Sequence, residues 1–225
     1  MEHPRVPSAA ETATGFRLWG TLEDMTELGT PKKKSLFTQA LIVVGGLLAF
    51  MWALEGLDAV TLNSLDSFGI EPRILGDLPN ILWAPLLHFG WPHLISNSIP
   101  FLVLGVMIYL SGPSKWVIAT AVSTVTSGLM AWLLAPIGSI TAGASGVIFG
   151  YLTYLLARGI FSRKLGQIVI AVVVFAIYGS VLWGVFPTAV GVSWQAHLGG
   201  AIGGVFAAWL VYGLDRRRTP QRMAY

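Results

Sequence analysis

Ser145 and His197 have the side-chain types that nucleophilic acyl transfer requires. Ser145 lies in the run Gly143-Ala144-Ser145-Gly146, and His197 lies near the start of a later apolar run. A serine hydroxyl is a weak nucleophile that needs an adjacent base, and imidazole has a suitable pKa. The apolar runs hold no Asp or Glu except Glu55 and Asp215 at their ends. We therefore predict a Ser145–His197 dyad without a carboxylate.

A second polar pair could bind the oxyanion of such a reaction. His93 and Asn97 are spaced i, i+4, which puts both on one face of a helix. The carboxamide and a ring nitrogen can each donate a hydrogen bond to developing negative charge. Ser145 opens a helix, so its backbone N–H lacks an intrahelical acceptor. We predict that His93, Asn97 and the Ser145 amide stabilise the oxyanion.

Each of these residues also has a simpler interpretation. A Gly-x-Ser-Gly run is a common helix-packing or turn motif in glycine-rich membrane proteins. A histidine in a span can bond a neighbouring carbonyl, and an asparagine such as Asn97 can join two helices. His88 is interpreted as a histidine that holds the outer loop in place. The catalytic hypothesis depends on the four residues falling at one depth.

The elements that position these residues are helices in a membrane. The hydrophobic fraction is 54%, charged residues make up 11%, and there is no Cys. Runs of about 20 apolar residues are typical of membrane-spanning helices. We predict an all-α polytopic protein with six spans at about 36–54, 92–110, 115–135, 145–157, 166–186 and 194–214.

The fourth predicted span is too short to cross the bilayer. From Ser145 to Arg158, taken as its inner end, the helix measures about 20 Å, roughly 10 Å less than the hydrocarbon layer. Ser145 should therefore lie below the outer surface, at the floor of a wet cavity. The chain before it must dip inward, with Gly143 allowing a tight turn.

Small residues should let the two catalytic helices approach closely. Gly146 and Gly150 form a stripe on the fourth span, and the sixth span carries Gly199, Gly200 and further small residues. Stripes of this kind allow helix backbones to pack closely in lipid. We expect the stripes to face each other and to bring Ser145 and His197 within hydrogen-bonding distance.

Basic residues predict the orientation of the spans, because they gather on the cytoplasmic side. Arg73 is the only basic residue predicted outside, in a long loop from Glu55 to Trp91 whose segment 81–87 should lie at the interface. Eleven basic residues that flank the spans or lie between them are predicted inside: Lys32, Lys33, Lys34, Lys115, Arg158, Arg163, Lys164, Arg216, Arg217, Arg218 and Arg222. Both termini should thus be cytoplasmic.

The chain divides into three predicted parts. Residues 1–35 form a polar cytoplasmic tail with no apolar run early enough for a signal peptide. Residues 36–214 form the six-helix domain, and residues 215–225 form a basic cytoplasmic tail.

Three short motifs, in this order, resemble those of the rhomboid family of intramembrane serine proteases. They are His93-Leu94-Ile95-Ser96-Asn97, Gly143-Ala144-Ser145-Gly146 and Ala196-His197-Leu198-Gly199-Gly200. The resemblance covers about residues 36–214. It implies a six-helix protease that cuts single-pass membrane proteins near a helix end, with Ser145 as nucleophile, His197 as base, and His93, Asn97 and the Ser145 amide as the oxyanion site.

The chain departs from the family pattern at two places. Phe149 stands where a tyrosine often packs on the base, and it can still stack on an imidazole. Trp83-Ala84 stands in the region where many members have Trp-Arg. The resemblance also implies substrate access between the second and fifth spans, with residues 187–193 as a movable cap.

The resulting prediction is a metal-free, cofactor-free intramembrane endopeptidase of the cell membrane. Its partners are the lipid bilayer and transmembrane substrates, with no nucleic acid; the oligomeric state stays open. Gly143, Gly146, Phe149 and Gly200 are predicted to support the site. Two alternatives are a non-catalytic relative that binds transmembrane clients and a small-solute channel. The first typically lacks the serine or histidine, and the second should have polar residues at all depths.

Overall fold

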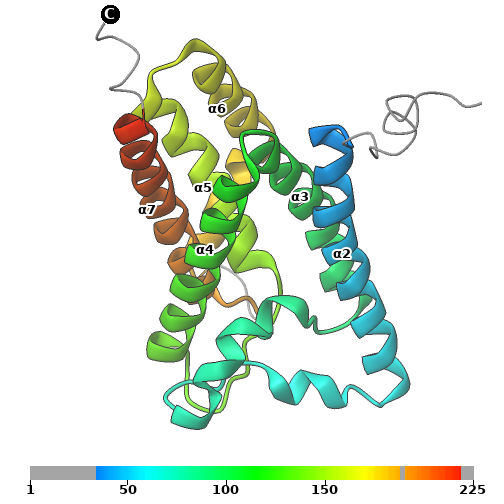
Figure 1. Cartoon of the computed structure of the whole chain (residues 1–225). Coiled ribbons are helices and arrows are strands. Elements are labelled where there is room, and N and C mark those ends of the chain that lie inside the picture. Colours follow the sequence, from blue (N-terminus) through cyan, green and yellow to red (C-terminus); the bar gives the residue numbers. More distant parts are fainter. Residues whose placement is uncertain (1–33, 188–190, 219–225) are drawn as a thin grey trace, which may run out of the picture. The chain divides into compact units, whose positions relative to one another are not determined.

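The computed structural model describes residues 34–187 and 191–218. Figure 1 shows the helices running up and down beside one another, with the loop after the first helix crossing one end. The all-α prediction is correct for the described residues. In chain order the elements are α2 (Leu36–Val60), η2 (Ser64–Phe68), η3 (Leu75–Leu82), η4 (Ala84–Leu86), α3 (Trp91–Leu110), α4 (Pro113–Leu134), α5 (Ser145–Ser162), α6 (Leu165–Tyr178), η5 (Gly179–Val185) and α7 (Trp194–Arg218).

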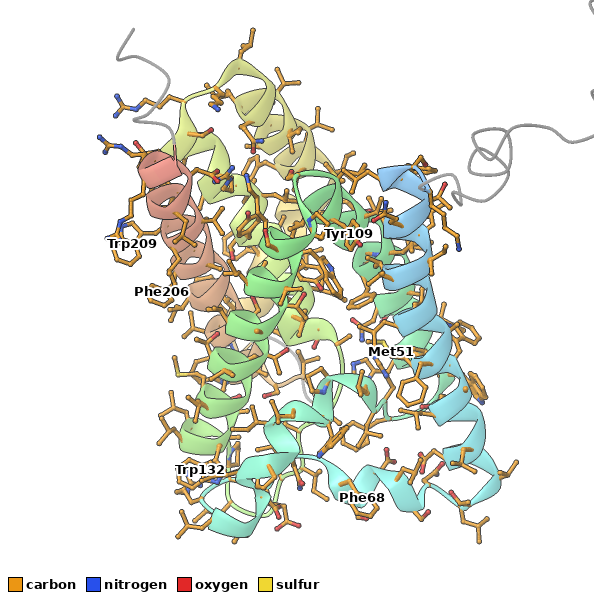
Figure 2. All side chains as sticks on the ribbon, in the orientation of Figure 1. Met51, Phe68, Tyr109, Trp132, Phe206 and Trp209 are labelled. Carbon is orange, nitrogen blue, oxygen red and sulfur yellow. The ribbon has the colours of Figure 1, made fainter. Side chains whose placement is uncertain are left out.

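The helices carry apolar side chains on the outside of the bundle as well as inside. Phe206 and Trp209 point away from α7 and are about half exposed, whereas Met51 and Tyr109 are buried (Figure 2). Within the described residues, five segments are long and apolar enough to cross a membrane: α2, α3, α4, α6 with η5, and α7. A surface of this kind suits lipid and marks a multi-pass membrane protein.

Helix α5 is the predicted span that is missing from those five. Most of its residues are buried, and it packs against α7, α4, α6 and α3 (Figure 1). A helix surrounded by other helices has little surface facing lipid, so it needs less overall hydropathy. Its sequence therefore carries glycines and polar side chains where its neighbours carry Val, Leu and Ile.

The predicted inner end of the fourth span is wrong. The prediction takes Arg158 as the inner end of the span, but α5 continues to Ser162, and Arg158 lies within the helix with 5% exposure. Both terminal nitrogens of Arg158 lie 3.1 Å from Asp215 Oδ2, and Lys115 Nζ lies 3.0 Å from the same oxygen. The Asp215 carboxylate compensates the buried charge of Arg158, so α5 can continue past this residue. At about 27 Å, α5 is still shorter than the hydrocarbon layer.

The fifth predicted span is not one continuous α-helix. The α-helical part ends at Tyr178, and Gly179–Val185 continues as the 3-10 helix η5. Val174 is the one buried residue of α6, and η5 has none. This segment is thus held against the bundle by few buried side chains.

The long loop between α2 and α3, which is predicted to be the outer loop, folds against the end of α4. Ile81 and Ala84 are buried with Ile70, while Leu82 and Trp83 are exposed. One side of this segment therefore packs on protein, and the other side is exposed.

Candidate active site

Ser145 and His197 meet where two helices begin. Ser145 is the first residue of α5, and His197 lies in the first turn of α7. Ser145 Oγ and His197 Nε2 are 2.9 Å apart, although the residues are 52 positions apart in the sequence. This is hydrogen-bonding distance for a nucleophile and its base.

Glycines allow α5 and α7 to come this close. A Cβ on Gly200 would collide with the carbonyl oxygen of Gly146, and a Cβ on Gly204 would collide with that of Gly150. Both collisions are with backbone, which cannot rotate away as a side chain does. The small-residue stripes of the two helices therefore face each other, and larger residues would separate the serine from the histidine.

Two further groups hold the imidazole of His197. Phe149 stacks on it, with 4.2 Å between ring centroids and 11° between ring planes. His197 Nδ1 lies 2.9 Å from the carbonyl oxygen of Gly184. A carbonyl oxygen can only accept, so Nδ1 carries the proton and Nε2 presents its lone pair to the Ser145 hydroxyl.

His93 and Asn97 of α3 line the same cavity as Ser145 and His197. The ring of His93 lies against Gly143, where a Cβ would be 2.6 Å from His93 Cε1; Gly143 also has a φ of +122°, which favours glycine. Asn97 is 8% exposed, and its side-chain nitrogen has no hydrogen-bond acceptor among the described residues. A buried donor without an acceptor, in the same cavity as the predicted nucleophile Ser145, is suited to bind a developing oxyanion.

The cavity has a volume of about 680 Å³. Its wall includes residues from the outer loop, α3, α4, the segment before Ser145, and the start of α7. A volume of this size accommodates several residues of an extended peptide and water. The four residues with predicted chemical roles, His93, Asn97, Ser145 and His197, thus line one cavity.

Comparison with known proteins identifies the fold family. The family model for the Rhomboid domain matches residues 76–214. This chain belongs to the rhomboid family. It is 43% identical over 195 residues to uncharacterized protein Rv1337 of Mycobacterium tuberculosis, with 81% of each chain covered. It is 29% identical over 185 residues to rhomboid protease GluP of Bacillus subtilis, covering 78% of this chain and 34% of GluP. Putative rhomboid protease YdcA of the same organism is 27% identical over 149 residues, covering 64% of this chain and 72% of YdcA.

In this rhomboid protein the outer loop fixes the segment that leads into Ser145. Ile70 and Thr141 form an antiparallel bridge with two backbone hydrogen bonds of 2.9 and 3.0 Å. The Gly143 amide donates to the Ala84 carbonyl at 2.8 Å. The sequence indicated a dipping segment here but not its partners, because backbone groups of any residue can form such bonds.

His88 of the outer loop is hydrogen-bonded to Ala144, the residue before Ser145. The Ala144 amide donates to His88 Nε2 at 3.3 Å, and His88 is 2% exposed. Burial, and then the charge of His93, lowers the pKa of His88 to about 4, while a bond at the Leu86 backbone acts in the opposite direction. A neutral ring is what the bond requires, because only the unprotonated nitrogen can accept. This position fits the interpretation of His88 as a holder of the loop.

Arg73 is a structural residue of this loop whose role the sequence did not reveal. Its guanidinium donates to the carbonyls of Leu133 and Ala135, both at 2.9 Å, at the end of α4. Trp132 Nε1 donates in return to the Ile74 carbonyl at 2.8 Å. Helix ends leave carbonyls without partners, and a cation there is favourable. The signal in the sequence was that Arg73 is the lone basic residue of an acidic loop.

Proposed function

We propose that this rhomboid protein is an intramembrane serine endopeptidase. It hydrolyses peptide bonds of transmembrane proteins near the outer membrane face. The observation that carries the proposal is the 2.9 Å contact between Ser145 Oγ and His197 Nε2 at the wall of a cavity. The names of GluP, a rhomboid protease, and YdcA, a putative one, support the same reaction class.

The proposed reaction proceeds in two acyl-transfer steps. Ser145 Oγ attacks the scissile carbonyl carbon while His197 Nε2 takes the hydroxyl proton. The tetrahedral intermediate collapses, the C–N bond breaks, and His197 gives its proton to the leaving amine. Water then attacks the acyl-enzyme, again with His197 as base, and releases the carboxylate product and free Ser145.

The negative charge that develops on the carbonyl oxygen needs donors at the same place. We assign this role to Asn97 Nδ2, a ring nitrogen of His93 and the Ser145 amide. The unsatisfied nitrogen of Asn97 and the position of Ser145 at the start of a helix support the assignment. The amides of Gly143 and Ala144 already bond to the outer loop, so they do not compete for the oxyanion.

The proposed topology has six spans with both termini in the cytoplasm. The Lys and Arg distribution supports it, with Arg73 alone in the long outer loop. The cavity then opens to the extracytoplasmic side. The proposed domain spans residues 36–214, between cytoplasmic tails at 1–35 and 215–225; residues 1–33 and 219–225 lie outside the described part.

Substrate access is proposed between α3 and α6. The scissile backbone must be extended to reach Ser145, so substrates should carry helix-destabilising residues near their outer membrane end. The exposed side chains of α6 support this route, since few of them are held by the bundle. Of the proposed cap at 187–193, residues 188–190 lie outside the described residues.

Labelling with a fluorophosphonate tests the proposed dyad. The probe forms a covalent bond only with an activated serine, so the wild type should be labelled at Ser145. Labelling should disappear in Ser145→Ala and in His197→Ala, and Ser139→Ala, another serine of the cavity wall, should be labelled like the wild type. Absence of labelling in the wild type would favour the client-binding alternative. Solute flux through liposomes without labelling would favour the channel.

A further inference from the structure

His197 Nδ1, the ring nitrogen that does not face Ser145, is hydrogen-bonded to the main chain. His197 Nδ1 donates to the Gly184 carbonyl at 2.9 Å, and no Asp or Glu in the described part of the chain is hydrogen-bonded to this imidazole. In serine hydrolases with a triad, a carboxylate at this nitrogen fixes the tautomer and the orientation of the ring. Here a backbone carbonyl occupies the corresponding position.

Gly184 is suited to this contact because it has no side chain. A Cβ at this position would lie 2.8 Å from Phe149 Cζ and 3.2 Å from His197 Nδ1. Any larger residue would push the 3-10 helix η5 away from the stacked Phe149 and His197 rings. The contact therefore depends on glycine for steric reasons rather than for an unusual backbone angle.

The carbonyl belongs to a segment that the bundle holds lightly. η5 has no buried residue and α6 buries only Val174, whereas His197 itself is 7% exposed on a tightly packed helix. His197 is thus part of α7, whereas the orientation of its ring depends on η5, which is freer to move. Segments with few buried contacts open at a low free-energy cost.

We propose that Gly184 is a positioning residue, whose carbonyl oxygen keeps His197 in the tautomer that accepts the Ser145 proton only while η5 lies against the Phe149–His197 pair. The inference rests on the proposed protease function and deepens it. Outward displacement of α6 and η5 releases Nδ1, and the ring then exchanges tautomers and rotates. With the proton on Nε2 the imidazole cannot act as base, so opening of this side of the cavity inactivates the dyad and its closure restores it.

Three variants of the full chain in liposomes test the proposal. Gly184→Ala should lower kcat on a transmembrane substrate about 10- to 100-fold, a part of the roughly 10²- to 10⁴-fold that general acid–base catalysis contributes, because the imidazole stays but its tautomer is no longer fixed. KM should change less than about threefold. Gly166→Ala is the matched control, because its Cβ meets nothing within 4 Å in the same segment, and it should match the wild type. Trp183→Ala removes an exposed ring that pairs with Phe186 and should lower kcat in the same direction by a smaller factor.

The decisive readout is the tautomer of His197. Nitrogen-15 NMR of histidine-labelled protein, assigned with His197→Asn, should show the proton on Nδ1 in the wild type and in Gly166→Ala. It should show a mixture in Gly184→Ala, or in Trp183→Ala if Gly184→Ala does not fold. A wild-type tautomer and wild-type kcat in these variants would overturn the positioning role. A wild type that neither cleaves nor reacts with fluorophosphonate would instead overturn the proposed function.

Discussion

The ring of Phe149 lies nearly parallel to the imidazole of His197, 4.2 Å from it and tilted by 11°. Phe149 is one turn after Ser145 on α5, so the helix that carries Ser145 also supplies the surface against which the His197 imidazole packs. The stack restrains the plane of the ring from one face, and the Gly184 carbonyl restrains its edge. A phenyl ring without a hydroxyl is sufficient for this contact.

Replacing Phe149 by Leu should lower kcat about fivefold, because an aromatic pair contributes roughly 1 kcal/mol beyond its buried area. Kinetics on a reconstituted transmembrane substrate would measure this change. Phe161→Leu is the matched control: Phe161 pairs with Tyr212 on the same two helices, with 6.2 Å between centroids, at the opposite end from Ser145. Equal losses in the two variants would show that the effect is on helix packing and not on the base.

Gly200→Ala should destabilise the protein by about 2 kcal/mol or more and abolish cleavage. Its Cβ would collide with the carbonyl of Gly146, so α7 has to move away from α5. Thermal unfolding in detergent would measure the loss. Gly213→Ala on the same helix meets nothing within 4 Å and should be unchanged or stabilised by up to about 1 kcal/mol. If both variants unfold at the wild-type temperature, the close approach of α5 and α7 does not depend on Gly200.

Acid should destabilise the protein through His88. Its pKa in the folded chain is lowered to about 4 from an ordinary value near 6.5. Above pH 6.5 the ring is neutral in both states, so this contribution is fully present. As the pH falls toward 4, the unfolded chain takes up the proton first, and up to about 3 kcal/mol is lost. Unfolding free energies between pH 7 and pH 4 should fall less steeply in His88→Gln than in the wild type; identical slopes would contradict the assignment.

Much of the site could be predicted because its residues obey local rules. The i, i+4 spacing of His93 and Asn97 and the glycine stripes beside Ser145 and His197 depend only on helix periodicity. The helices that carry them begin within two residues of their predicted starts. Four residues from three helices line one cavity, and the sequence predicted that they would lie at one depth.

The remaining features depend on partners far away in the chain. Arg158 looked like the end of a span because its neutralising Asp215 is 57 residues away. Arg73 bonds to carbonyls 60 and 62 residues away. Gly184 acts through its carbonyl oxygen, a group that every residue has, so no residue type could have indicated it. Neither hydropathy nor spacing carries information about such contacts.

The central claim is tested most directly by cleavage in liposomes. The purified wild type should cut a transmembrane peptide that has helix-destabilising residues near its outer end, and mass spectrometry should place the cut near that end. Ser145→Ala should give no product while its unfolding temperature stays that of the wild type. Product formation by Ser145→Ala at the wild-type rate would contradict the account.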